Sequence, residues 1–370
     1  MDRKLQYQIW DCLEKIVVEN IKNNVFSACS VGIIEGGSSS YNKTVFHYGD
    51  SGRSGGAEPL DDTTIYDLAS LTKPLVTVLS VLALVEMGKL KLSDPLADYF
   101  DVPSDRYKQI QIHHLLEHKS GLPAHREYFK QLIRFPQTDR LNWLIDCILN
   151  ESLEADPGCR EVYSDLGYIL LGKIVENVSG EKLNDFWQRT VISPLGLEDG
   201  LFFNVNKKLK GNVVPATGYC QWSNRELCGL VNDDNCRSLG GVAGHAGLFG
   251  SAEGLVQFCE ILLKMYDGSY NHPALSFDLV RRKLQNDHGR WILGFDTPTG
   301  AQPSSGNYFS DETIGHLGFT GTSFWLDCRS RRGVVLLTNR VLYSDDVSSI
   351  RKFRPLVHNT IIEKLTDEKG

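Results

Sequence analysis

The 370-residue sequence lacks the features that mark several large classes of protein. No stretch combines the length and apolar character expected of a membrane-spanning helix. Segment 1–24 lacks the apolar core and the small-residue cleavage site of a secretory signal. Acidic residues outnumber basic ones, so the net charge is −7. This charge argues against general nucleic-acid binding. The expected partner is a small-molecule or peptide substrate rather than a nucleic acid or a membrane.

Cysteine is neither dense nor arranged in short pairs. Nine cysteines, an odd number, are scattered through the chain. Structural zinc sites usually carry C-x-x-C knuckles, which the even spacing of Cys220, Cys228 and Cys236 lacks. Free thiols in a reducing compartment are therefore expected, and with the initial Met1 they predict a cytoplasmic protein. Neither a metal nor an organic cofactor is expected.

The order of strand and helix patterns predicts an α/β architecture. An amphipathic helical pattern over 1–24 precedes strand patterns between 26 and 48. The middle of the chain, 90–265, is mainly helical, and strand patterns return in 291–338 before a final helix after Ser344. Because strands lie at both ends and helices between them, we expect one sheet closed by the two termini.

The most informative stretch is Ser70 to Lys73, which opens an apolar run with helical spacing that reaches Met87. Ser70 is a suitable N-cap, and Pro74 falls in the first turn, where proline is tolerated. Residues three apart share one side of a helix, so these Ser and Lys side chains can meet. Burial lowers the pKa of a lysine, and a neutral amine beside a hydroxyl can take its proton. Taken alone, S-x-x-K also fits a capping serine and a surface lysine.

Two further segments carry residues suited to the same chemistry. Tyr163 stands just before a predicted helix, and Asp165 lies at the start of that helix. Taken alone, they are a packed aromatic residue and a helix cap. His316 lies in 315–322, where small residues let another backbone or a ligand approach closely. Taken alone, it is an ordinary strand histidine.

In this order, the three segments resemble the serine hydrolases of the class C β-lactamase and penicillin-binding-protein superfamily. That superfamily carries S-x-x-K, then Y-x-N, then K-T-G or a variant. Four further blocks of this sequence resemble superfamily blocks, and the last two resemble those of an esterase-like and carboxypeptidase-like subgroup. The blocks are His114 to Pro123, Asp156 to Gly172, Gly240 to Phe249 and Leu337 to Arg340.

The resemblance implies a β-lactamase-like fold, in which an antiparallel sheet is flanked by helices. Residues 1–88 and 291–370 would form this sheet domain, and residues 89–290 an inserted, mainly helical domain. The active site would lie in the cleft between them. The implied reaction is hydrolysis of an ester or amide through an acyl-enzyme, with D-alanyl peptides, β-lactams and small esters as candidate substrates.

The resemblance also implies roles by matching position. Ser70 is the nucleophile, and Lys73 and Tyr163 form the proton-transfer pair that serves it, the leaving group and the water. The main-chain N–H groups of Ser70 and Phe319, the residue after Gly318, form the oxyanion hole.

The sequence departs from the superfamily at two positions. Asp165 stands where asparagine is commonest, and an aspartate there could hold Lys73 protonated or contact a cationic or amide substrate differently. His316 stands where β-lactamases usually carry a lysine that helps to hold a substrate carboxylate. A histidine is mostly neutral at pH 7, which weakens the case for a β-lactamase or a strict carboxylate-terminal peptidase. Esters and other amides stay open.

Alternatives follow from the same residues. The departures at Asp165 and His316 also fit a catalytically weak penicillin-binding or regulatory protein on the same fold. A remoter alternative is a zinc peptidase, because His114, Glu117 and His118 match H-x-x-E-H.

Overall fold

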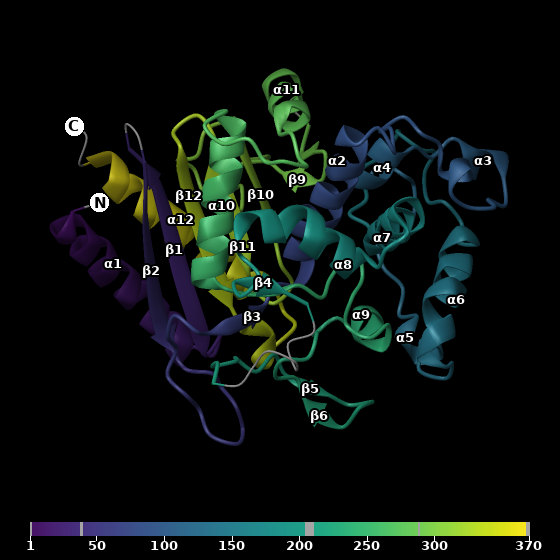
Figure 1. Cartoon of the computed structure of the whole chain (residues 1–370). Coiled ribbons are helices and arrows are strands. Elements are labelled where there is room, and N and C mark those ends of the chain that lie inside the picture. Colours follow the sequence, from purple (N-terminus) through teal and green to yellow (C-terminus); the bar gives the residue numbers. More distant parts are fainter. Residues whose placement is uncertain (1, 38–39, 204–210, 288, 368–370) are drawn as a thin grey trace.

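The computed structural model of the protein describes residues 2–37, 40–203, 211–287 and 289–367. Its main element is a seven-stranded antiparallel sheet to which both ends of the chain contribute (Figure 1). In spatial order the strands are β2 (Tyr41–Gly49), β1 (Ala28–Gly36), β12 (Arg332–Thr338), β11 (Ser323–Asp327), β10 (Thr313–Leu317), β9 (Phe295–Asp296) and β8 (Trp291–Ile292). The predicted antiparallel sheet flanked by helices is confirmed.

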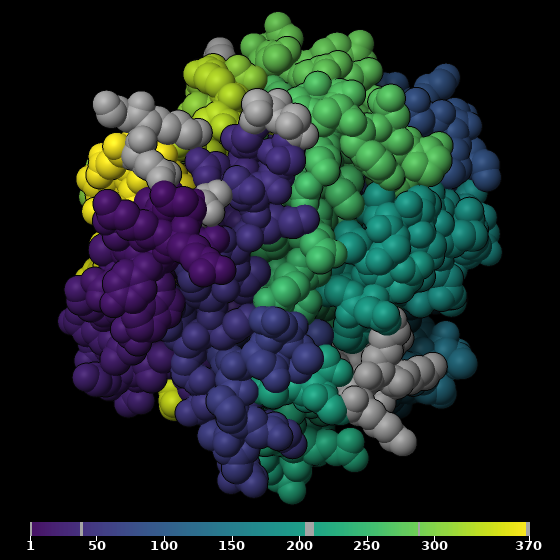
Figure 2. Space-filling view, turned by 60° about the vertical axis from the view of Figure 1, so that its left-hand side comes forward, coloured from purple at the N-terminus to yellow at the C-terminus, as the bar shows by residue number. Residues whose placement is uncertain are grey.

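Helices cover both faces of this sheet. On β12, Val334 and Leu336 pack against α1 (Arg3–Lys22) and α12 (Ser348–Asp367), whereas Val335 and Leu337 face the opposite core. This alternation follows from the two-residue period of a strand. Figure 2 shows the purple N-terminal segment beside the yellow C-terminal one, in agreement with the contact between α1 and α12.

The second face of the sheet packs against α10 (Ala252–Tyr266). The approach is close, because a Cβ atom on Gly32 of β1 would lie 2.2 Å from a methyl group of Val256. By sequence α10 falls within 89–290, the predicted inserted domain, yet it packs on the sheet. The division into 1–88 with 291–370, and 89–290, stays a prediction.

The remaining helices gather beside the sheet (Figure 1). They are α3 (Asp105–Lys108), α4 (Ile112–Leu116), α5 (Phe129–Leu132), α6 (Gln137–Leu149), α7 (Asp165–Ser179), α8 (Leu183–Trp187), α9 (Asp234–Ser238) and α11 (Asp278–Asn286). Short 3₁₀ or π segments are η3 (Leu96–Asp98), η4 (Gln188–Ile192), η5 (Ser193–Leu195) and η7 (Arg340–Leu342). Small strands pair as β3 (Ile65–Asp67), β7 (Phe249–Ser251) and β4 (Leu201–Phe202), and as β5 (Tyr219–Cys220) with β6 (Arg225–Glu226).

The segment that carries Ser70 is less regular than predicted. A 3₁₀ turn, η1 (Ala69–Leu71), leads into a π-helix, η2 (Lys73–Val78), and then into α2 (Leu79–Glu86). Ser70 therefore lies inside the first turn, and the prediction that it is an N-cap is wrong. Pro74 has no N–H to donate in the first turn of η2, which fits the irregular start. π segments of this kind are frequent at functional sites.

The sequence-based expectation that no stretch is long and apolar enough to span a membrane is also wrong. Residues Ala69–Glu86 are long and apolar enough to do so. In the fold 83% of this stretch is buried, and α2 contacts α7 and α8. Its apolar character is thus accounted for by packing in the protein core.

All nine cysteines are free, as predicted. The cytoplasmic location expected on this ground, and the expectation of no nucleic-acid or membrane partner, stay predictions.

Candidate active site

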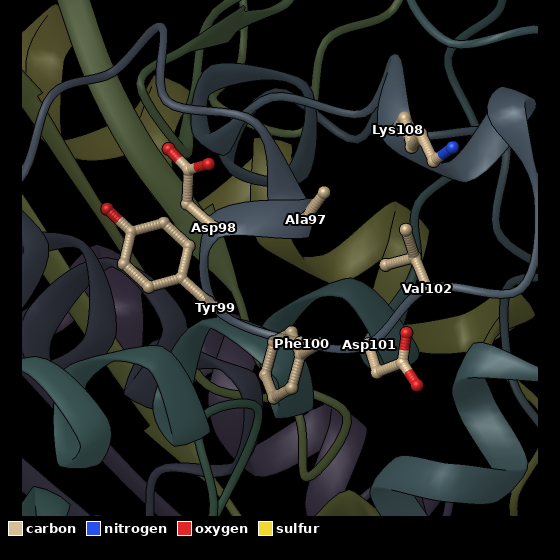
Figure 3. A pocket seen from close by; sticks show the side chains of 7 residues that line it. All are labelled: Ala97, Asp98, Tyr99, Phe100, Asp101, Val102 and Lys108. Carbon is tan, nitrogen blue, oxygen red and sulfur yellow. The ribbon is translucent and has the colours of Figure 1, made fainter.

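The three predicted segments meet at one cavity of about 2100 Å³. Its lining includes Ser70 from η1, Tyr163 from the loop before α7, Asp165 from the first turn of α7, His316 from β10, and Phe319 from the turn after β10. Lys73 is fully buried behind this lining. A smaller hollow of about 470 Å³, lined by 97–102 and Lys108, contains none of these groups (Figure 3).

Lys73 lies within hydrogen-bond distance of three acceptors. Its Nζ atom donates to Ser70 Oγ at 2.9 Å, to Asp165 Oδ1 at 2.7 Å and to the carbonyl oxygen of His245 at 3.3 Å. Three acceptors match the three N–H bonds of an ammonium group. Burial lowers the pKa of Lys73, but Asp165 and then Tyr163 outweigh burial and raise it overall. Lys73 is therefore protonated at neutral pH, which is the effect anticipated for an aspartate at position 165.

Asp165 joins Lys73 to a wider polar network. It is the first residue of α7, a helix capped by Ser164, whose side chain accepts from the N–H of Gly167 at 3.3 Å. Its second carboxylate oxygen lies 3.0 Å from His125 Nδ1. Burial raises the pKa of Asp165, but Lys73 and His125 outweigh burial and hold it well below its usual range. The aspartate is thus ionised.

Two members of this network were not identified from the sequence as site residues. The hydrogen bond that His125 donates to the Asp165 carboxylate raises the pKa of His125, which lines the cavity. Asp233 also lines the cavity, and its Oδ1 lies 2.9 Å from Nε2 of His245. The backbone carbonyl oxygen of the same histidine accepts the hydrogen bond from Lys73. His125 stands two residues after Pro123, the end of a family-like block, and this position was the available signal.

Tyr163 is a further neighbour of Lys73. The Lys73 nitrogen is 4.7 Å from the centre of the tyrosine ring, which packs on His118 at 4.6 Å and Trp291 at 5.6 Å between ring centres. Although the residue is 38% exposed, burial raises the pKa of Tyr163. The opposing effects of Lys73 and Ser70 are smaller, so the phenol is protonated in the resting site.

His316 is neutral, as expected for this position. Its Nδ1 lies 2.8 Å from the carbonyl oxygen of Leu317, and because a carbonyl only accepts, Nδ1 carries the proton. Burial and then Lys73 lower the pKa of His316 to about 3. Burial also holds the pKa of His118 well below its usual range. Both imidazoles are therefore uncharged, whereas the Arg290–Asp296 ion pair of the cavity lining, at 3.0 Å beside Trp291, is charged.

The turn after β10 is bonded to the segment before Ser70. Thr320 Oγ1 donates to the carbonyl oxygen of Asp67 at 2.8 Å, and Thr322 Oγ1 donates to that of Leu68 at 3.2 Å. A Cβ atom on Gly318 would lie 2.8 Å from the Leu68 oxygen, so the close approach requires glycine. These contacts place Phe319 and Ser70 on the wall of one cavity, as the proposed oxyanion hole requires.

Backbone strain marks the same place. Ala69, directly before Ser70, has a φ angle of 49°, in the left-handed region that alanine rarely adopts. Its N–H donates to Asp67 Oδ1 at 2.9 Å, which helps to hold it. Strain of this kind clusters at functional sites, where the surrounding structure maintains it.

The residues of the H-x-x-E-H pattern have other contacts. His114 Nδ1 accepts from the N–H of Gln111 at 3.2 Å, Glu117 pairs with Lys283, and His118 packs on Tyr163. Two other groups of three residues in the described chain bring ligand atoms within 4.8 Å of one another. They are His47, Asp62 and Glu253, and His125, Asp165 and Asp233. The geometry gives the zinc-peptidase alternative no support.

In this site a serine is hydrogen-bonded to a buried lysine, and a tyrosine lines the same cavity. This arrangement is typical of a serine hydrolase. The Beta-lactamase family model matches residues 13–357, and the chain belongs to this family.

Known relatives agree with this assignment. The Escherichia coli (strain K12) protein named "Putative D-alanyl-D-alanine carboxypeptidase" is 31% identical over 303 residues, which cover 75% of this chain and 69% of that protein. The octameric penicillin-binding protein homologue from Pyrococcus abyssi has a TM-score of 0.70 at 22% identity, covering 96% of this chain and 77% of the other. A class C β-lactamase from Rhodobacter sphaeroides also has a TM-score of 0.70, at 18% identity, covering 96% of this chain and 99% of the other. The predicted resemblance and fold are confirmed.

Proposed function

We propose that the protein hydrolyses an amide or ester through an acyl-enzyme on Ser70, with D-alanyl-terminated peptides as the leading substrate class. The observation that carries the proposal is the 2.9 Å contact of Lys73 Nζ with Ser70 Oγ, at a cavity that both Ser70 and Tyr163 line. These residues hold the positions of the nucleophile and the proton-transfer pair in the superfamily.

The resting charges determine how the cycle starts. Lys73 and Tyr163 are both protonated, so the pair must lose one proton to solvent before it can act as a base. The pair then takes the proton of Ser70 as Oγ bonds to the carbonyl carbon. The N–H groups of Ser70 and Phe319 bind the resulting oxyanion. The pair next protonates the leaving group as its bond to carbon breaks, leaving an ester on Ser70.

Hydrolysis of that ester repeats the proton transfers in the opposite sense. A water molecule gives a proton to the pair and adds its oxygen to the acyl carbon. The pair then returns a proton to Ser70 Oγ as the carboxylic acid product leaves. No net proton is consumed by the enzyme.

Two observations support D-alanyl peptides as the substrate class: the name of a relative and the volume of the cavity. The Escherichia coli relative carries the carboxypeptidase name over an alignment that covers three quarters of this chain. The cavity of about 2100 Å³ has room for several peptide residues.

Neutral ester hydrolysis is the second candidate, and one observation favours it. His316 is uncharged at the position where β-lactamases place a lysine toward a substrate carboxylate. A substrate without a carboxylate would lose nothing by this exchange.

The test of the proposal combines covalent labelling with a substrate panel. A fluorophosphonate probe should add to Ser70, as read by mass spectrometry of the peptide, and should not label Ser70→Ala. Ser80→Ala is the matched control, because Ser80 is a buried serine in α2 whose hydroxyl has no hydrogen-bond partner among the described residues.

The panel contains a D-Ala-D-Ala peptide, its L-Ala-L-Ala counterpart, nitrocefin and a p-nitrophenyl ester. Turnover of the D-peptide that is lost in Ser70→Ala supports the leading class, and turnover of the ester alone supports the second. If the wild-type protein shows neither labelling nor turnover, this result would contradict the proposal and favour the binding or regulatory alternative.

A further inference from the structure

Arg354 of α12 is a buried cation without an acidic partner. The residue is 5% exposed, and no carboxylate of the described residues forms an ion pair with its guanidinium. Burial, with repulsion from Arg340 and Arg351, lowers the pKa of Arg354 to about 9. Burying a charge is costly unless its hydrogen bonds compensate. What Arg354 binds therefore indicates why the fold retains it.

Arg354 binds the turn that carries Phe319. Its Nη2 atom donates to the carbonyl oxygen of Gly318 at 2.8 Å and to that of Thr322 at 2.9 Å. Gly318 O also accepts from the N–H of Gly321 at 3.1 Å. The carbonyl thus has one neutral and one charged donor, and a hydrogen bond to a charged donor is about twice as strong as one to a neutral donor.

The Gly318 carbonyl and the Phe319 N–H belong to the same peptide unit. A trans peptide is planar, so these two bonds point in opposite directions and turn together. A donor that fixes the Gly318 oxygen therefore also fixes the direction of the Phe319 N–H. It also polarises the peptide, which strengthens that N–H as a donor.

We propose that Arg354 is a positioning residue for the oxyanion hole, acting through the Gly318–Phe319 peptide. The inference rests on the proposed function, in which the Phe319 N–H binds the oxyanion. Because its effect appears only as negative charge develops on the substrate oxygen, Arg354 contributes to turnover more than to ground-state binding.

The test uses the full-length variants Arg354→Met, Arg354→Lys and Arg332→Met. Arg332 is a matched control, because it is also nearly buried and its Nη2 donates to a carbonyl oxygen of α12, that of Leu365, at 2.7 Å. That bond lies at the other end of α12 from Arg354. Loss of either arginine removes a buried hydrogen bond to a backbone carbonyl oxygen. Only the bond of Arg354 fixes the Gly318–Phe319 peptide.

The readouts are kcat, KM and affinity for an alkylboronic acid, which forms a tetrahedral adduct with a serine. We expect Arg354→Met to lower kcat by about 10- to 100-fold, less than the loss of a whole oxyanion donor, with KM changed by no more than about twofold. Boronate affinity should fall by a similar factor, and Arg354→Lys should recover part of both. Arg332→Met should lose thermal stability while keeping kcat and boronate affinity.

Several outcomes would overturn the inference. A folded Arg354→Met variant with wild-type kcat and boronate affinity would do so, as would an equal loss of both in Arg332→Met. If Arg354→Met does not fold, Arg354→Gln replaces it, with at least a fivefold loss of kcat expected by the same reasoning. Wild-type protein that neither turns over substrate nor reacts with fluorophosphonate would contradict the proposed function itself. A reactive wild type with unaffected Arg354 variants would contradict this inference alone.

Discussion

The two sides of Ser70 differ in charge although both are built from polar side chains. On one side Lys73 is protonated and Asp165 is ionised, and His125 extends the network toward the cavity. On the other side His316 and His118 are buried and uncharged. Tyr163 contacts both, because its ring packs on His118 and lies over the Lys73 nitrogen.

In the proposed mechanism this difference separates proton transfer from the shaping of the cavity. The imidazole of His316, whose pKa is lowered to about 3, takes up no proton at neutral pH. The proposed acid–base groups therefore lie on the charged side, with Lys73, and the neutral His316 on the other side forms part of the cavity wall. The predictions below test this separation, beginning with the largest expected effect.

Replacing Lys73 by Met removes the group that contacts Ser70 on the charged side. We expect Ser70 phosphonylation by fluorophosphonate to slow by about 10³- to 10⁴-fold, the upper range for a general acid–base group. The rate is read by mass spectrometry of the labelled peptide. Lys43→Met is the control, because Lys43 pairs with the carboxylate of Glu260 away from the cavity lining. Near-wild-type phosphonylation of Lys73→Met would contradict a role in proton transfer.

Replacing Tyr163 by Phe keeps the ring that packs on both sides and removes only the hydroxyl. We expect kcat to fall by about 100-fold with little loss of stability. Tyr168→Phe is the control within the same aromatic cluster. Its hydroxyl donates to the carbonyl oxygen of Leu116 at 3.0 Å, so this variant should lose about 1 kcal/mol of unfolding free energy and keep its activity. Equal activity of the two variants would show that the Tyr163 hydroxyl takes no part.

Replacing Asp165 by Asn should move the pH dependence of activity. The carboxylate stabilises the Lys73 ammonium and raises the pKa of that lysine, so the basic form appears only at higher pH. Removing the carboxylate lowers this pKa, and the acid limb of the kcat/KM profile should move down by about one pH unit or more.

The control for the aspartate is Asp233→Asn, because Asp233 bonds to His245 and not to Lys73. Its shift in the pH profile should be smaller. An acid limb that stays in place or moves to higher pH in Asp165→Asn would show that the carboxylate does not set the protonation of the pair.

The smallest effect is expected at the neutral histidine. His316→Gln should change kcat/KM for a neutral ester by no more than about threefold, because an imidazole with a pKa of about 3 takes up no proton at neutral pH. The pH profile should also keep its shape. An ionisation between pH 5 and 8 that is present in the wild type and absent from His316→Gln would contradict the neutral assignment of this histidine.

Short segments of the sequence were sufficient to predict the family, the sheet and the residues around Ser70. Ser70 to Lys73 contains a nucleophile and a possible base within one helical turn, so local spacing already places them together. The strand patterns near both termini likewise predicted one sheet built from both ends of the chain, because strand periodicity is local, whereas its antiparallel order was expected from the family resemblance. The catalytic roles given to these residues stay proposals.

Interactions between distant segments were not predictable in this way. The contact of His125 with Asp165 and that of Arg354 with Gly318 join residues 40 and 36 positions apart, and no periodic pattern marks them. The effect of Asp165 on Lys73, 92 positions away, was anticipated only because the family resemblance placed the two residues in one site. The irregular start at Ser70 was missed as well, because the apolar spacing of the run resembles that of a regular helix.

The central claim is that Lys73 and Tyr163 act on Ser70 as one proton-transfer unit. The most direct test is a double-mutant cycle on the rate of Ser70 acylation, comparing Lys73→Met, Tyr163→Phe and the variant with both changes. Groups that act as a unit have non-additive effects, so the double variant should be no more than about threefold slower than Lys73→Met alone. A double variant whose loss equals the product of the two single losses would show that the residues act independently and would contradict the account.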